Sequence, residues 1–116
     1  MGGTLLISGT QSGIPTGEAV IGPFNVPMSN VDETLSVTLA QGDNTFALPA
    51  AIEGVIIMIP ANQTGVVKLK GAGADTGVPL SVLEPTVLEF PSGGVPASII
   101  LNASVAGTSP TTVRAI

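Results

Sequence analysis

The fold class follows from one stretch of the sequence, which reads ETLSVTLAQGDNTFALP from Glu33 to Pro49. Polar and apolar residues alternate from Glu33 to Ala40, a period typical of a half-buried β-strand. The next residues, 41–44, are typical of a tight turn, because Gly and Asn tolerate positive φ and Asp bonds its own backbone. A second strand follows from Thr45 to Leu48, so the stretch predicts a β-hairpin.

The segments outside this stretch repeat the same alternation of short strands and turns. Turn sequences recur roughly every 8–12 residues, the spacing of a β-sandwich or barrel. Val55–Ile59 is apolar on both faces, as in a central strand that is covered on both sides. Val66–Lys70 places Val67 and Leu69 inward and its two lysines outward. Further strands are expected at residues 78–83, 86–90, 97–101 and 111–116, and a loop at residues 71–77.

No stretch has helical periodicity over two turns. We therefore predict an all-β domain over residues 31–116, an antiparallel β-sandwich or a jelly-roll-like barrel. Residues 1–30 differ from this domain because they are rich in Gly and Pro between short apolar pieces. They predict an extended N-terminal arm that docks on the domain or on a neighbouring subunit, with a disordered tail as the alternative.

The candidate assembly-interface residues come from the arm and from the most apolar strand. The arm carries Phe24, Val26 and Met28 beside prolines, and large apolar groups of this kind are favoured over charges at subunit interfaces. The apolar strand adds Ile56 and Met58. We predict that these five side chains contact other subunits.

Charge and hydropathy restrict the class of partner. The chain has eight acidic and three basic residues, a net charge of −5, and only 9% charged residues, against about 25% in an average domain. Nucleic acid is excluded as an expected partner, because binding to phosphates needs clustered Lys and Arg. The mean hydropathy of +0.58 leads us to expect that like or unlike subunits cover much of the surface. We also expect a homo-oligomer and favour a trimer.

The residue types also argue against catalysis. The chain has no His and no Cys, so the usual zinc sites, a Ser-His-Asp triad and a thiol nucleophile are excluded. A carboxylate pair such as Asp32 and Glu33 is the remaining acid–base chemistry. Adjacent strand residues face opposite sides, however, and a sugar-cleaving site of that kind normally also has Trp or Tyr platforms, which this chain lacks. We expect no enzyme activity, no catalytic residue, no cofactor and no metal.

A membrane partner is not expected either. The longest apolar run, Val55 to Pro60, is far shorter than the roughly 20 residues of a membrane-spanning helix. The first residues lack the basic region and the long apolar run of a signal peptide.

Five segments of the chain resemble small virion structural proteins of tailed bacteriophages. They are Leu35–Pro49, Val55–Pro60, Val67–Gly77, Pro85–Leu88 and Ile99–Ser104. The resemblance lies in the pattern of strands and turns, and it implies a β-sandwich or jelly-roll-like module with no catalytic residues.

Two functions follow from this resemblance as expectations. The first is a capsid decoration (cement) protein that binds and stabilises the shell of major capsid protein, so that the chain resides in the virion after assembly in the host cytoplasm. The alternative is a tail, fibre or baseplate component that takes part in host attachment.

Overall fold

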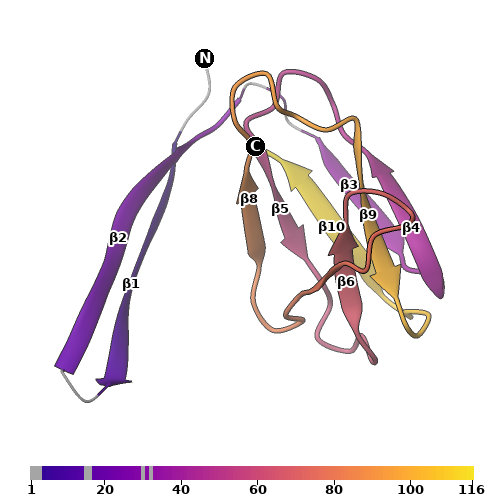
Figure 1. The fold of residues 1–116 in the computed structure, drawn as a ribbon, viewed down its shortest axis with the longest axis horizontal. Helices are drawn as coiled ribbons and strands as arrows, with labels where there is room; N and C mark the ends of the chain where they lie inside the picture. Colours follow the sequence, from indigo (N-terminus) through magenta and orange to yellow (C-terminus); the bar gives the residue numbers. More distant parts are fainter. Residues whose placement is uncertain (1–3, 15–16, 30, 32) are drawn as a thin grey trace.

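The computed structural model describes residues 4–14, 17–29, 31 and 33–116, and of residues 8–14 and 17–27 it describes the backbone only. These residues form ten β-strands (Figure 1). The strands are β1 (Thr4–Ile14), β2 (Gly17–Pro27), β3 (Thr34–Thr38), β4 (Gly42–Ala47), β5 (Gly54–Met58), β6 (Val67–Lys70), β7 (Val78–Pro79), β8 (Thr86–Glu89), β9 (Ser98–Ala103) and β10 (Pro110–Ala115). The described part of the chain contains no helix that is long and apolar enough to cross a membrane.

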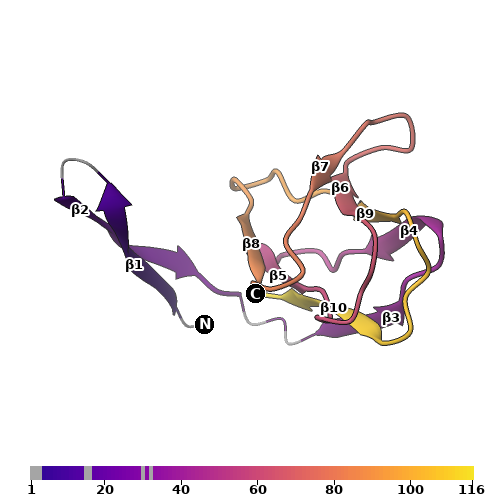
Figure 2. The same cartoon turned by 90° about the horizontal axis from the view of Figure 1, so that it is seen from below.

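Strands β3 to β10 form a sandwich of two four-stranded antiparallel sheets. The strand orders are β3-β10-β5-β8 and β4-β9-β6-β7, and the two sheets face each other in Figures 1 and 2. The pairings are nested, because β3 pairs with β10, β4 with β9, β5 with β8 and β6 with β7. Apart from the β6–β7 connection, each successive strand lies in the opposite sheet, which is the order of a jelly roll. The predicted all-β sandwich is confirmed.

The core lies between the two sheets and is built by the inward positions of the central strands. Val55, Ile57 and Val113 come from one sheet, and Phe46 and Leu101 come from the other. All five are at most 5% exposed. Since burying a large apolar side chain stabilises a fold by about 1.5–3 kcal/mol, these alternating positions supply most of the packing between the sheets.

The predicted hairpin over residues 33–48 is wrong. β3 pairs with β10, and β4 pairs with β9 in the other sheet, so the connection between β3 and β4 crosses from one sheet to the other. The side chain of Asn44 stabilises this crossing, because its Oδ1 accepts from the N–H of Ala40 and its Nδ2 donates to the carbonyl of Ala40, both at 2.9 Å. The Asn44 side chain thus satisfies both backbone hydrogen-bonding groups of Ala40, as a paired strand would otherwise have done.

One further expectation about strand faces needs correction, and a second holds although the side chain is buried. β5 is central in its sheet, as predicted, but its outer face is open, because Met58 is 54% exposed. In β6, Val67 is buried and Leu69 packs against the core, as predicted. Lys70 lies on the outer face, as predicted, but is only 8% exposed, because the loop at residues 71–77 folds over it and Gly73 accepts a hydrogen bond from it. The position of that loop as a loop is confirmed.

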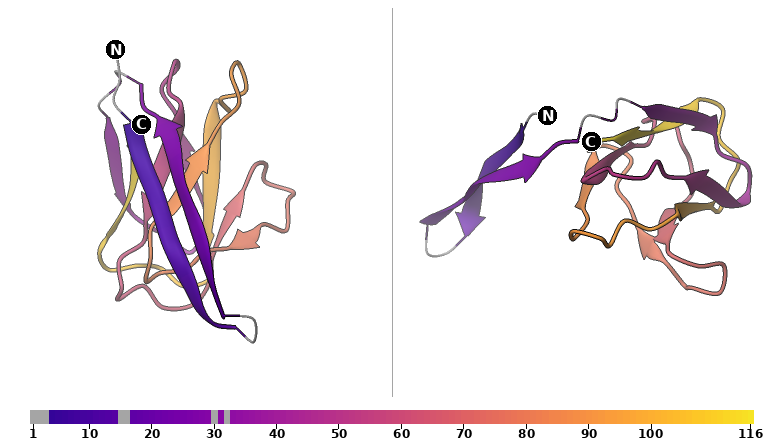
Figure 3. Two further views of the ribbon diagram at one scale, coloured as in Figure 1. Left: turned by 90° about the vertical axis from the view of Figure 1, so that its left-hand side faces the viewer. Right: turned by 90° about the horizontal axis from the view of Figure 1, so that it is seen from above.

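The N-terminal segment forms a hairpin of its own, which the sequence patterns had not predicted. β1 and β2 pair antiparallel from Thr4↔Pro27 to Ile14↔Gly17, with two irregularities in register. This two-stranded sheet, hereafter the arm, pairs with no other described strand. Figures 1, 2 and 3 show it projecting beside the sandwich on the side of β8, opposite to β3 and β4.

Candidate functional site

The outer face of the sheet β3-β10-β5-β8 carries an apolar strip. Because side chains alternate along a strand, Val55 and Ile57 point into the core, and Ile56 and Met58 lie on the opposite, outer face. Val87 of β8 lies directly across from Ile56 and is only partly buried. The strand therefore presents apolar side chains to the outside in the middle of a sheet.

The base of the arm lies against this strip. A shallow cleft of about 530 Å³ separates β1 from the sandwich. It is lined by Leu5, Leu6, Ile7, Ile56, Glu84, Pro85 and Val87. This set is hereafter called the arm cleft. Its only charged member is Glu84, so the arm cleft suits contact with apolar protein surface and offers no acid–base pair.

The structure brings some of the predicted interface residues together. Ile56 and Met58 share the outer face, and Ile56 lines the arm cleft. In the arm, Phe24 and Val26 are in register opposite Ile7 and Leu5.

The side chains of Phe24 and Val26 lie outside the described residues. Met28, which follows β2, is partly buried. That these five residues contact other subunits stays a prediction.

Several exposed apolar residues near the arm were missed by the sequence analysis. Leu6 is 61% exposed, and Leu83, in the loop before β8, is 78% exposed. The apolar run at Leu5–Ile7 is the sequence feature that could have identified Leu6 as a candidate interface residue. Alternation alone does not identify such residues, because it does not say which face of a sheet is left uncovered.

A second apolar pocket lies at the end of the sandwich where the β4–β5 and β8–β9 loops meet. Its volume is about 650 Å³, and prolines 49, 91 and 96 are among its lining residues. It contains one carboxylate and one hydroxyl, Glu53 and Ser92, and no second ionisable group. The pocket therefore lacks the carboxylate pair that glycoside hydrolysis normally uses.

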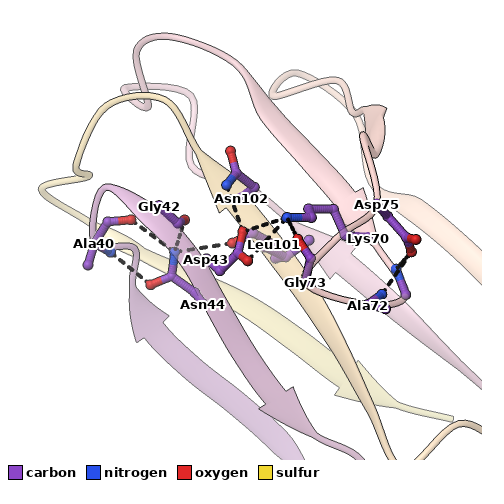
Figure 4. Close-up of polar contacts among 11 residues, drawn as sticks. Ala40, Gly42, Asp43, Asn44, Lys70, Ala72, Gly73, Asp75, Leu101 and Asn102 are labelled. Atoms are coloured by element: carbon purple, nitrogen blue, oxygen red, sulfur yellow. Dashed lines mark hydrogen bonds and ion pairs between the residues drawn. The ribbon is translucent and has the colours of Figure 1, made fainter.

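The outer face of the other sheet carries a polar network centred on Asp43 (Figure 4). Lys70 donates from Nζ to both carboxylate oxygens of Asp43, at 3.0 and 3.1 Å, and to the carbonyl of Gly73 at 2.8 Å. Asn102 donates to Asp43 Oδ1 at 2.7 Å. Asp75 accepts from two backbone N–H groups at the start of the same loop. The network ties the loop at residues 71–77 to β4 and β9.

The network stabilises the ionised form of Asp43. Hydrogen bonds from Asn102 and from Lys70 hold the pKa of the Asp43 carboxyl below its ordinary value, the charge of Lys70 acts in the same direction, and partial desolvation opposes them. A lowered folded-state pKa means that the stabilisation is complete above the unfolded pKa of about 3.9 and is lost as pH falls through the folded value. We expect Asp43→Asn to lower the urea midpoint of unfolding at about pH 7, and the difference from wild type to be smaller at about pH 2.

The control for this prediction is Glu89→Gln, which removes an exposed carboxylate from the opposite sheet and leaves the network intact. It is expected not to reproduce the pH-dependent difference. An Asp43→Asn variant that is equally destabilised at both pH values would contradict the electrostatic explanation.

The remaining acidic side chains that the structure describes do not assemble into a site. Among the residues whose side chains are described, no three His, Cys, Asp or Glu residues lie close enough to hold a metal ion. Comparison with protein-family models, with curated proteins and with solved structures finds no match to this chain. The functional conclusion therefore depends on the geometry of the surfaces described above.

Proposed function

We propose that this chain is a structural protein of a bacteriophage particle, a decoration (cement) protein that binds the shell of major capsid protein in many copies. One observation carries the proposal: the arm is a long two-stranded sheet that pairs with no other described strand. An isolated hairpin is marginally stable in water at best. An arm of this kind is stabilised when it lies on the surface of another subunit.

The apolar surfaces support the same proposal. The arm cleft is lined by residues of both the arm and the sandwich, including Glu84, and the preceding residue, Leu83, is 78% exposed. The outer face of β5 is open at Met58, and residues 4–27 contain a single charged residue, Glu18. Contacts made through such surfaces derive their free energy from apolar burial. A jelly roll is a frequent fold of capsid proteins, but it also occurs in lectins and cupins, so the fold alone does not carry the function.

The first test is the number of copies in purified particles, measured by quantitative mass spectrometry. A decoration protein is expected in numbers comparable to the major capsid protein. A few copies per particle would favour the alternative, a tail, fibre or baseplate component. Particles without this chain would overturn both.

The second test asks whether the arm makes the contact. Leu6 is 61% exposed on the arm, and Val78 is 63% exposed on β7 in the other sheet. Since losing the burial of one leucine costs about 1.5–3 kcal/mol, we expect Leu6→Glu to weaken co-sedimentation with empty shells by about tenfold or more. Val78→Glu, the matched control, is expected to bind as the wild type does. Equal binding by all three proteins would contradict an attachment role for the arm.

A further inference from the structure

The four edge strands of the sandwich differ in how they are protected from pairing with another chain. The edges are β3 and β8 in one sheet and β4 and β7 in the other. β7 has two residues and contains Pro79, β8 follows Pro85 and ends at Glu89, and β4 carries Gly42 and Asp43. Proline, charge and short length are the usual means by which proteins block edge pairing.

β3 has none of these features. Its sequence, TLSVT, contains no charge, Pro or Gly, and it pairs with β10 residue by residue from Thr34 to Thr38 without a bulge. An uncharged, regular edge strand is a template for a further strand.

The backbone groups on the free edge of β3 can be assigned. Ala115 donates its N–H to the carbonyl of Glu33 at 2.8 Å, and in an antiparallel pair the hydrogen-bonded positions alternate. Leu35 and Val37 therefore bond to β10. The N–H and C=O groups of Thr34, Ser36 and Thr38 point away from it.

The sequence of β3 is close to a palindrome about Ser36. A second β3 running antiparallel, with Ser36 on a two-fold axis, places Thr34 opposite Thr38 and Leu35 opposite Val37. Each of the three outward-pointing pairs then exchanges two backbone hydrogen bonds. Such a contact uses the same patch on both subunits, as two-fold interfaces require.

The side chains fit this pairing on both faces. Thr34, Ser36 and Thr38 are exposed on the outer face, where Thr and Ser side chains favour one another across strands. Val37 is 43% exposed although it is on the face that packs toward the core, and Leu35 of a second copy would cover it. The chain carries a net charge of −5, yet this contact brings no like charges together.

We propose that the β3 edge binds a second copy of this chain, antiparallel and with Ser36 at the two-fold axis, so that two four-stranded sheets become one continuous sheet. The proposal does not depend on the proposed function, since β3 and the arm lie on opposite sides of the sandwich (Figures 1 and 2). The proposal predicts a dimer with two-fold symmetry, whereas the sequence analysis favoured a trimer.

The test is a charge exchange at Ser36, read by sedimentation velocity and native mass spectrometry of the full chain. Wild type is expected to dimerise, and more strongly as salt screens its net charge. Ser36→Lys and Ser36→Glu each bring like charges together at the axis and are expected to weaken dimerisation at least tenfold. An equimolar mixture of the two variants is expected to form heterodimers, because Lys then opposes Glu. Ser92→Lys, at an exposed serine in the β8–β9 loop, is the control and is expected to dimerise.

A disulfide cross-link between two copies tests the two-fold pairing of β3 independently of the charged variants. The chain contains no Cys, and directly opposed Cα atoms of a hydrogen-bonded pair lie about 5.5 Å apart, which is within the range of a disulfide. Ser36→Cys is expected to give a covalent dimer on oxidation, and Ser92→Cys is not. A wild type that stays monomeric at the highest attainable concentration, an oligomer that Ser36→Lys leaves unchanged, or a failure of Ser36→Cys to cross-link would overturn the proposal.

Discussion

Leu101→Ala is expected to lower the free energy of unfolding by about 2–5 kcal/mol, the range for leucine deletions in closed cores. Leu101 is completely buried in the centre of β9, between Asn44 of β4 and Leu69 of β6. Both neighbouring strands are hydrogen-bonded to β9, so the backbone cannot collapse into the cavity. A loss of this size is a large share of the 5–15 kcal/mol by which domains are typically stable.

Urea unfolding followed by circular dichroism measures this loss, because the chain lacks the Trp and Tyr needed for intrinsic fluorescence. The slope of the unfolding free energy against urea concentration (the m value) should stay unchanged if the substitution affects only the native state. Leu83→Ala makes the same substitution at a leucine that is 78% exposed, and a change within about 0.5 kcal/mol is expected. Equal losses in the two variants would show that Leu101 does not lie in a closed core.

Gly54→Ala is expected to destabilise the sandwich by about 3 kcal/mol, at the upper end of the range for added core atoms. Gly54 is buried where β5 begins, and a Cβ at this position would overlap the backbone carbonyl of Leu88 in β8. On its other side, Gly54 exchanges backbone hydrogen bonds with Ile116. The strand is therefore held from both sides and cannot move away from the added methyl group.

Gly73→Ala is the matched control for this substitution. A Cβ at Gly73 would meet no atom closer than Asp43 Oδ2 at 3.9 Å, which is an ordinary contact. Thermal unfolding of both variants should therefore show a large decrease for Gly54→Ala and little change for Gly73→Ala. Similar melting temperatures for the two variants would contradict the close approach of β5 and β8.

Alternation along the chain correctly identified most of the sandwich strands. Segments such as Val66–Lys70 and Glu33–Ala40 have a period of two, and their inward residues pack toward the core except Val37, which is 43% exposed at the edge of the sheet. The period reports only which residues share a face, because that information is local to the strand. The pairing partner is a non-local choice, which is why β3 and β4 look like a hairpin in the sequence although they lie in different sheets.

The arm is a second case in which the local pattern did not predict strand pairing. Its Gly- and Pro-rich composition distinguished residues 1–30 from the domain, but the strand pairing of β1 with β2 has two register irregularities that break any regular alternation. The outward-facing Ile56 and Met58 were identified as interface candidates because they are apolar. That the strip is open, and that the base of the arm lies beside part of it across the arm cleft, depends on how the sheet is covered.

The sequence by itself determined the β-strand class, most of the inward residues, and the absence of His and Cys, because these properties depend only on residue type and local period. Only the tertiary structure decided the nested jelly-roll pairing, the burial of Lys70 beneath its loop, and the contrast between the protected edges and β3. These features arise where segments distant in the chain meet, and the free energy that selects them comes from packing and hydrogen bonding between strands. No single strand carries that information.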